Sequence, residues 1–337
     1  MTTLKMELPT ATYDITVGRG ALALAGSLFN LNRRTLVVTD SGVPAEYAEA
    51  VAESAAEAEI LVLESGEATK SLDGYATVLR TMSEFGMDRG DCVVAVGGGV
   101  VGDLAGFAAS SYMRGVDFYN VPTTLLSQLD SSIGGKTAIN LDGIKNIVGA
   151  FYQPRGVIID PTVLKTLPAR HIAAGLAEAV KMSLTSDRDL FAIFEECESP
   201  LDRVEDIIIR SLKIKMEIVR ADEREGGLRK LLNFGHTLGH GIEASANGAL
   251  LHGECVALGM LPMCSPELRA RLITVLKKLS LPTEYAGDMN AALALMSHDK
   301  KCKGDSVDAV FVTDVGEAKI ERIPLSTLSE RIRRVFP

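Results

Sequence analysis

CVVAVGGGVVGDLAGFAA, from Cys92 to Ala109, is the strongest local pattern in the first half of this chain. An apolar run typical of a buried strand leads into three glycines, residues 97–99, and a helical pattern follows with Gly102 and Asp103 in its first turn. Glycines let the backbone turn sharply and approach a ligand closely, and the helix N-terminus offers free N–H groups to a pyrophosphate. The pattern is not the GxGxxG fingerprint, so close packing of strand on helix is the alternative interpretation.

The rest of the first half surrounds this turn with short apolar runs that alternate with helical patterns. We expect strands at residues 35–39, 60–63, 92–96 and 157–159, and helices at residues 44–58 and 72–85. Strands that alternate with helices form βαβ units and a mostly parallel sheet. The sequence therefore predicts an α/β fold with an N-terminal, Rossmann-like, parallel-sheet nucleotide-binding domain over residues 1–164.

From about residue 168 onward, patterns typical of strands become rare. We expect helices at residues 169–184, 204–220, 232–246, 253–260 and 266–279. One late β pattern, at residues 309–312 and 319–323, precedes a final helix. The sequence thus predicts a second, mostly α-helical domain over residues 165–337, and a cleft between two domains is the default position for a binding site.

The composition narrows the class of protein. The 337 residues are 47% hydrophobic and 23% charged, as in ordinary globular proteins. No run approaches the roughly 18 apolar residues of a membrane span, and the N-terminus lacks the apolar core of a secretory signal. No CxxC pair occurs, so free thiols in a reducing compartment, the cytoplasm, are expected. The five cysteines are Cys92, Cys197, Cys255, Cys264 and Cys302.

The net charge of −9 argues against a nucleic-acid surface, since no basic run accompanies it. An acidic protein still binds an anionic metabolite where its few cations converge. Three residues of the first half are candidate nucleotide contacts. Asp40 directly follows an expected strand and is suited to bind ribose hydroxyls, while Glu67 and Lys70 follow the next strand and could reach the same ligand. A solvated loop is the alternative for each of them.

Three of the five histidines stand within seventeen positions, which favours a metal site. His236 and His240 are four residues apart on an expected helix, hence on one face, and His252 opens the next helix. Glu178, between two alanines of an apolar helix with Lys181 one turn later, is the candidate carboxylate, because an unpaired buried glutamate is costly. Two histidines and a glutamate form an open, catalytic type of zinc site, and spacing leaves open which two histidines bind.

A series of motifs resembles the 3-dehydroquinate synthase family. In order they are GGGVVGDLAGF, YMRG, PTTLL, DSSIGGKTAIN, KNIVGAFYQP, GLAEAVK, DEREGGLRKLLNFGHTLGH and HGE. The resemblance covers nearly the whole chain, from about residue 10 to about residue 325. It implies that the chain binds NAD and one divalent metal, zinc or else cobalt, in a cleft between an α/β domain and an α-helical domain, and that it forms a homodimer in the cytoplasm.

The implied reaction converts 3-deoxy-D-arabino-heptulosonate 7-phosphate to 3-dehydroquinate and phosphate, a step of the shikimate pathway to aromatic amino acids. Its steps are transient oxidation by NAD, phosphate elimination, re-reduction, ring opening and intramolecular aldol closure. Such a lyase recycles its NAD. A substrate with a carboxylate and a phosphate carries about −2.5 to −3 charges near neutrality, which calls for a convergence of cations.

The resemblance also implies roles for individual residues. It implies that the metal ligands are Glu178, His236 and His252, so that His240 becomes a polar neighbour. The implied substrate-binding and catalytic residues are Asp130, Lys136, Asn146, Lys181, Lys215, Arg229, Asn233, His240 and Lys300, with Arg114 reaching the substrate phosphate across the dimer interface. The implied cofactor-binding residues are Asp40, Glu67, Lys70, Gly98, Gly99, Asp103, Thr123, Thr124, Lys145 and Thr166.

The chain departs from the family after Met260, where the usual longer helical excursion is short and Pro262 and Pro266 are unexpected in a helix interior. Three other functions remain as alternatives. One is another sugar-phosphate cyclase, a 2-deoxy-scyllo-inosose or 2-epi-5-epi-valiolone synthase. The second is a glycerol or iron-type alcohol dehydrogenase, which would produce net NADH. The third is a non-catalytic protein that binds metal or nucleotide.

Overall fold

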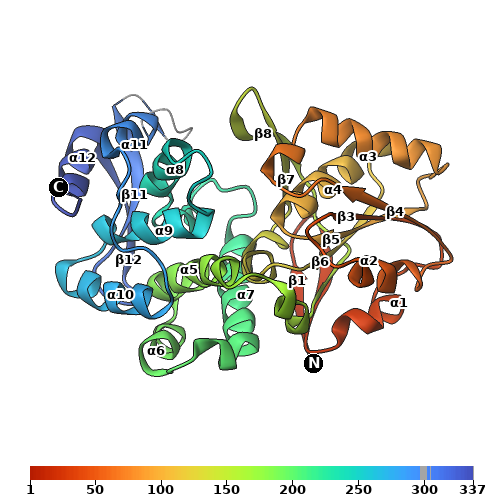
Figure 1. Ribbon diagram of the computed structural model, residues 1–337, viewed down its shortest axis with the longest axis horizontal. Helices are drawn as coiled ribbons and strands as arrows, with labels where there is room; N and C mark the ends of the chain where they lie inside the picture. The colour runs from red at the N-terminus through yellow and green to blue at the C-terminus, as the bar shows by residue number, and fades with distance from the viewer. Residues whose placement is uncertain (297–301, 304, 337) are drawn as a thin grey trace. The chain divides into compact units, whose positions relative to one another are not determined.

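The computed structural model describes residues 1–296, 302–303 and 305–336. The chain divides into two compact units, Met1–Leu167 and Pro168–Pro337. The strands and helices of the first unit are β1 (Thr2–Glu7), β2 (Thr12–Val17), α1 (Ala25–Leu28), β3 (Arg34–Asp40), α2 (Ala45–Ala52), β4 (Glu57–Leu63), α3 (Leu72–Glu84), β5 (Cys92–Gly97), α4 (Gly99–Ser111), β6 (Asp117–Pro122), β7 (Lys136–Leu141), β8 (Ile144–Phe151) and β9 (Gly156–Ile159). Figure 1 shows the course of each unit.

The first unit is built on a seven-stranded sheet with the order β1-β2-β9-β6-β5-β3-β4. Only β1 pairs antiparallel, and the other neighbours are parallel. The side chains of β3 and β5 alternate between two buried clusters, because successive residues of a strand point to opposite faces. Both faces of the sheet are therefore covered, as in a doubly wound parallel sheet, and the predicted α/β fold class is confirmed.

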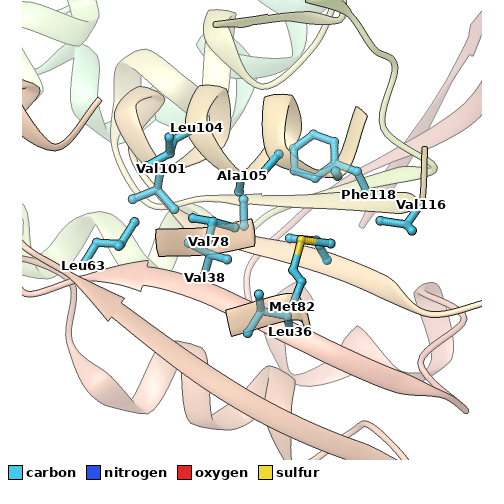
Figure 2. Packing of buried hydrophobic residues seen from close by; sticks show 14 of the residues in the cluster. Leu36, Val38, Leu63, Val78, Met82, Val101, Leu104, Ala105, Val116 and Phe118 are labelled. Carbon is cyan, nitrogen blue, oxygen red and sulfur yellow. The ribbon is translucent and has the colours of Figure 1, made fainter. Parts of the chain in front are cut away.

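One of these clusters lies under α3 and α4 (Figure 2). Leu36 and Val38 of β3 face Val78 and Met82 of α3, and all four side chains are fully buried. Burial of each such side chain stabilises the fold by about 1.5–3 kcal/mol. The glycine-rich stretch thus begins in a core strand, β5, whose position between β6 and β3 fixes the start of α4.

The second unit is mainly helical, and its elements are α5 (Ala169–Ser186), α6 (Arg188–Glu196), α7 (Val204–Ala221), α8 (His236–Ser245), α9 (His252–Met260), α10 (Pro266–Lys278), α11 (Met289–Met296), β10 (Cys302–Lys303), β11 (Ser306–Val312), β12 (Ala318–Pro324) and α12 (Leu325–Arg333). The three strands form a small antiparallel sheet. Helix α5 packs against α6, α7 and α9, and α8 packs against α9 and α11.

Two of the expected helices have different bounds. The helix expected at 44–58 ends at Ala52, and Glu57 already begins β4, because pairing with β3 overrides the helical preference of the alanines and glutamates. The helix expected at 232–246 begins only at His236, after a 3₁₀ turn at Leu228–Asn233 and Gly235 at φ 76°. A Cβ on Gly235 would lie 2.9 Å from the Val256 carbonyl oxygen, so this turn lies directly against α9.

The stretch after α9, which the resemblance implies is short, is not a helix interior. A 3₁₀ turn, Leu261–Met263, follows α9, and Pro266 is the first residue of α10, where a proline is tolerated. The guanidinium groups of Arg269 and Arg331 donate to the backbone carbonyls of this connection. The prolines are therefore compatible with the local structure.

Four cysteines, Cys92, Cys197, Cys255 and Cys264, are free thiols, as expected, and the side chain of Cys302 lies outside the described residues. Among the described helices, none is both long and apolar enough to cross a membrane.

Candidate metal and nucleotide sites

The second unit holds a carboxylate inside α5. Glu178 is fully buried, and the Nζ atom of Lys181, itself 1% exposed, lies 2.5 Å from Glu178 Oε2. Neither carboxylate oxygen has a hydrogen-bond partner among the described residues. Burial raises the pKa of Glu178, but attraction from Lys181 and His252 outweighs it and lowers the pKa to about 2. Glu178 is therefore a buried anion with oxygens left to bind a cation.

Two histidine rings face this carboxylate. His236 is the first residue of α8 and His252 the first of α9. Their Nε2 atoms lie 3.6 Å and 3.4 Å from Glu178 Oε1. Ligand atoms about 2.1 Å from a tetrahedral zinc ion lie about 3.4 Å from one another, so the spacing suits a metal ion bound by all three side chains. Glu178, His236 and His252 form one of the groups whose ligand atoms all lie within 4.8 Å of one another.

The protonation of His252 couples to metal binding, because a metal ion would replace a proton of the ring. Burial lowers the pKa of the ring, but the carboxylates of Glu178 and Glu243 outweigh it and raise the pKa to about 10. A divalent ion at Nε2 would take the position of the proton that these carboxylates favour, so metal binding would release a proton.

Close helix packing brings His252 to Glu178. A Cβ on Gly253 would lie 1.9 Å from the Ala174 carbonyl oxygen of α5, so only glycine permits this approach of α9. Glu254, the next residue, accepts two hydrogen bonds of 2.7 Å from the guanidinium of Arg170 and one of 2.8 Å from the backbone N–H of Leu251. All three residues of the HGE motif thus act at this contact: one faces Glu178, one permits the approach, and one fixes the start of α9 to α5.

His240 completes a cluster of three imidazoles. Its ring centroid lies 5.3 Å from that of His236 and 5.9 Å from that of His252. His240, Glu243 and His252 form a second group with the spacing of metal ligands. The spacing of the histidines in sequence left open which of them bind. The buried carboxylate favours the set with Glu178, in which His240 is a neighbour.

Other expected substrate residues of the second unit lie on elements that pack against α5. Lys215 is buried on α7, and Arg229 is 2% exposed in the turn that precedes α8. Arg229 donates to the Glu223 carbonyl, and the side-chain amide of Asn233 donates to Glu225 Oε1 at 2.7 Å. Burial of these cations distinguishes them from solvated surface charges. Lys300 lies outside the described residues.

Expected nucleotide contacts of the first unit follow neighbouring parallel strands. Asp40 ends β3, Gly98 and Gly99 follow β5, and Thr123 and Thr124 follow β6. These three strands are adjacent in the sheet, and Thr166 lies in the 3₁₀ turn Pro161–Thr166 after β9, the next strand. The carboxyl ends of parallel strands are where α/β proteins bind nucleotides. The N-terminus of α4 opens at this edge and can receive a pyrophosphate.

Further predicted residues of the first unit meet around Lys70. Its Nζ donates to Asp103 Oδ2 and to Asn146 Oδ1, each at 2.5 Å. Glu67 accepts a hydrogen bond of 2.8 Å from the side-chain amide of Asn140, whose oxygen in turn accepts from the backbone N–H of Asn146 at 2.9 Å. The β7–β8 hairpin is thereby joined to α4 and to the turn after β4.

Four further predicted residues lie on other segments of the first unit. Asp130 lies in a π-helical turn, Ser127–Ser131, while Lys136 begins β7 and is exposed. Lys145 is exposed on β8. Arg114 is exposed too, and both it and Met113 have positive φ, 72° and 48°. Such backbone angles are sparsely used by residues other than glycine and cluster at functional positions.

Two residues at these sites escaped the sequence analysis. The Glu243 carboxylate lies 3.1 Å from His252 Nδ1 and can accept its hydrogen bond, and Asn140 joins Glu67 to Asn146. Glu243 stands three residues after His240 and seven after His236, so helical periodicity puts it on the same face of α8. That spacing could have revealed it, whereas no spacing reveals Asn140.

Solved structures with this fold include two kinds of sugar phosphate cyclase. A 2-deoxy-scyllo-inosose synthase in complex with carbaglucose-6-phosphate, NAD+ and Co2+ is 27% identical, covers 99% of this chain and all of its own, and has a TM-score of 0.89. A 2-epi-5-epi-valiolone synthase from Streptomyces hygroscopicus with NAD+ and Zn2+ is 29% identical with a TM-score of 0.87, and the match covers 98% of both chains. Glycerol dehydrogenase from Schizosaccharomyces pombe, 17% identical with a TM-score of 0.66, shares the fold alone.

Models of the N-terminal and C-terminal parts of 3-dehydroquinate synthase match residues 60–174 and 175–302. The 3-dehydroquinate synthase of Streptococcus sanguinis is 43% identical over 353 aligned positions, which cover 98% of this chain and 99% of the relative. That of Latilactobacillus sakei is 38% identical and covers 99% and 98%. The chain therefore belongs to the 3-dehydroquinate synthase family.

Proposed function

We propose that this protein converts 3-deoxy-D-arabino-heptulosonate 7-phosphate to 3-dehydroquinate and phosphate, with bound NAD and one divalent metal. The observation that carries the proposal is the buried Glu178, which faces two histidines in a chain 43% identical to a 3-dehydroquinate synthase. The related cyclase structures contain NAD+ with Co2+ or Zn2+, which supports the same cofactors here.

Glu178, His236 and His252 would hold the metal in the second unit. In the first unit, the N-terminus of α4 would hold the pyrophosphate of NAD, with Asp40 at the ribose. When bound, the metal supplies Lewis-acid polarisation of a substrate hydroxyl, and NAD supplies reversible hydride transfer. The assignment of NAD to residues 1–164 and of the metal and substrate to residues 165–337 is part of this proposal.

The chain's own side chains would bind and orient the substrate. Lys181, Lys215 and Arg229 supply buried positive charge for its carboxylate and phosphate, since charge-assisted hydrogen bonds to such groups are stronger than neutral ones. His240 stands beside both histidine ligands and is suited to move a proton at a substrate oxygen. The remaining substrate contacts of this proposal are Arg114, Asp130, Lys136, Asn146, Asn233 and Lys300.

The elimination of phosphate needs no dedicated base in this scheme, because the substrate's own phosphate accepts the proton. The protein would then mainly hold the substrate in one conformation and neutralise the charge of its carboxylate and phosphate. A homodimer, in which Arg114 reaches the neighbouring substrate, and a location in the cytoplasm belong to the same proposal.

A substrate panel tests the assignment. Purified protein with NAD and Zn2+ is offered 3-deoxy-D-arabino-heptulosonate 7-phosphate, glucose 6-phosphate and sedoheptulose 7-phosphate separately, and phosphate release is followed. We expect turnover of the first substrate only. Turnover of glucose 6-phosphate or sedoheptulose 7-phosphate in its place would overturn the assignment in favour of a different sugar-phosphate cyclase.

A further inference from the structure

The two histidines that face Glu178 both have an acceptor at the opposite ring nitrogen. His236 Nδ1 lies 3.1 Å from the backbone carbonyl oxygen of Phe234. His252 Nδ1 lies 3.1 Å from a carboxylate oxygen of Glu243. Nε2 of each ring faces Glu178. Both histidines therefore direct one ring nitrogen toward the proposed metal position and the other toward a hydrogen-bond acceptor.

This arrangement has a chemical consequence for each ring. A neutral imidazole binds a metal through its unprotonated nitrogen, so the N–H must be on the other one. An acceptor at Nδ1 keeps the N–H there, fixes the plane of the ring and makes Nε2 a stronger ligand. For His236 the acceptor is backbone and is fixed by the fold. For His252 it is a side chain, and therefore can be changed without altering the ligands.

The position of Glu243 is set by the packing of α8 on α9. It lies on α8 on the face that carries His240, and His252 begins α9, which packs against that helix. Its side chain is only 15% exposed, and that of His252 is 30% exposed. A carboxylate with little access to water interacts more strongly with the ring than a solvated one would.

We propose that Glu243 is a positioning residue of the metal centre, which accepts the Nδ1–H of His252 and so directs Nε2 of that ring to the ion. It acts through His252 and is not itself a ligand. The inference rests on the proposed metal binding by Glu178, His236 and His252. It excludes the second group, His240, Glu243 and His252, as the ion's binding site.

Co2+ binding tests this inference apart from catalysis. The metal-free protein is titrated with Co2+ against a competing chelator, for the wild type and for Glu243→Ala, Glu243→Gln and Ser245→Ala. Loss of a partner to a ligating histidine typically weakens metal binding about 10–100-fold, which is the effect expected for Glu243→Ala. Glu243→Gln keeps an acceptor without the charge, so its affinity should lie between those of the wild type and the alanine variant.

Ser245→Ala is the matched control, because Ser245 lies on the same helix and its hydroxyl bonds with Ile242 and Tyr285 instead of the histidines. We expect its Co2+ affinity to equal that of the wild type. The visible absorption of the bound Co2+ provides a second measurement. At saturating Co2+ the spectrum of Glu243→Ala should match that of the wild type, since the ligand set is the same.

Three results would overturn the inference. Equal Co2+ affinity of the wild type, Glu243→Ala and Glu243→Gln would show that Glu243 does not position His252. A changed Co2+ spectrum in both Glu243 variants would make Glu243 a ligand. A wild-type protein that binds no Co2+ would overturn the proposed function together with this inference, whereas the first two results leave the proposed function intact.

Discussion

A buried anion without hydrogen bonds to its oxygens is costly unless something else stabilises it, and within the described part of the chain Glu178 is such a group. Lys181 supplies one positive charge at Glu178 Oε2, while Oε1 faces His236 and His252. A divalent ion would satisfy that oxygen and both rings at once. The cost of burying the Glu178 charge inside the apolar helix α5 is therefore what favours a metal ion at this position.

Removal of a ligand should abolish high-affinity metal binding. We expect His236→Ala and His252→Ala to lose tight Zn2+ binding, measured by competition with a chelator, because two protein ligands hold zinc less well than three. His171→Ala is the control, since His171 is an exposed histidine of α5. Wild-type affinity in either ligand variant would contradict the assigned set.

The close approach at Gly253 makes a second prediction. In Gly253→Ala the new methyl group would meet the Ala174 carbonyl at 1.9 Å, so α9 must move away from α5. We expect a loss of about 1–3 kcal/mol in the free energy of unfolding, from urea denaturation, and weaker Zn2+ binding because His252 moves with the helix.

Gly226→Ala is the comparison for this change, since its methyl group would be 3.8 Å from its nearest neighbour, Asp222 Oδ1. In Gly226→Ala, the free energy of unfolding and the Zn2+ affinity should both stay near the wild-type values. Unaltered stability and Zn2+ affinity in Gly253→Ala would show that α9 need not lie so close to α5.

At the scale of elements, Asp117 ties the start of β6 to neighbouring segments. Its carboxylate accepts hydrogen bonds of 2.7 Å from both Arg33 and Arg155. Burial raises the pKa of Asp117, but the two guanidinium groups outweigh it and hold the pKa below the ordinary 3.8. A carboxyl with a lowered folded-state pKa stabilises the fold fully above its unfolded pKa and loses that contribution as the pH falls through the folded one.

Asp117→Asn should therefore reduce the acid sensitivity of the fold. At neutral pH we expect the variant to be less stable by about 1–2 kcal/mol, as for loss of hydrogen bonds to a charged group. As the pH falls below 3.8, the urea midpoints of the wild type and the variant should converge. Asp14→Asn, at an exposed position of β2, is the control. A constant difference at all pH values would contradict the role of the charge.

Sequence patterns predicted some elements better than others for physical reasons. The strand at Cys92–Gly97 and the start of α4 were predictable because a continuous apolar run ends in glycines. The hairpin formed by β7 and β8 was not, because its residues lack clear alternation and its position depends on contacts with Lys70. The antiparallel pair β1–β2 was also missed, since polar residues occupy much of it.

The site was predictable in a similar way. Helical spacing brought His236 and His240 together, and the alanines around Glu178 indicated its burial. The relation of Glu243 to His252 could not be predicted, because it depends on how α9 returns to α8 after the turn between them. Contacts within one element follow from periodicity, whereas contacts between elements follow from packing.

The whole molecule combines a net charge of −9 with buried cations at the positions proposed for an anionic substrate. Its alignment with the Streptococcus sanguinis relative spans 353 positions, more than the 337 residues of this chain, so the relative has residues that this chain lacks. In this chain a 3₁₀ turn, Leu261–Met263, connects α9 to α10, and Arg269 and Arg331 donate to backbone carbonyls of this connection. The metal ligands proposed above lie outside that connection.

The most direct test of the central claim is the stoichiometry of the reaction with 3-deoxy-D-arabino-heptulosonate 7-phosphate. Released phosphate, 3-dehydroquinate identified by mass, and NADH absorbance are measured together in the presence of NAD and Zn2+. We predict equal amounts of phosphate and 3-dehydroquinate, no accumulation of NADH, and loss of activity with a chelator that added Zn2+ restores. NADH that accumulates without phosphate release, or no turnover at all by the metal-loaded protein, would contradict the proposed reaction.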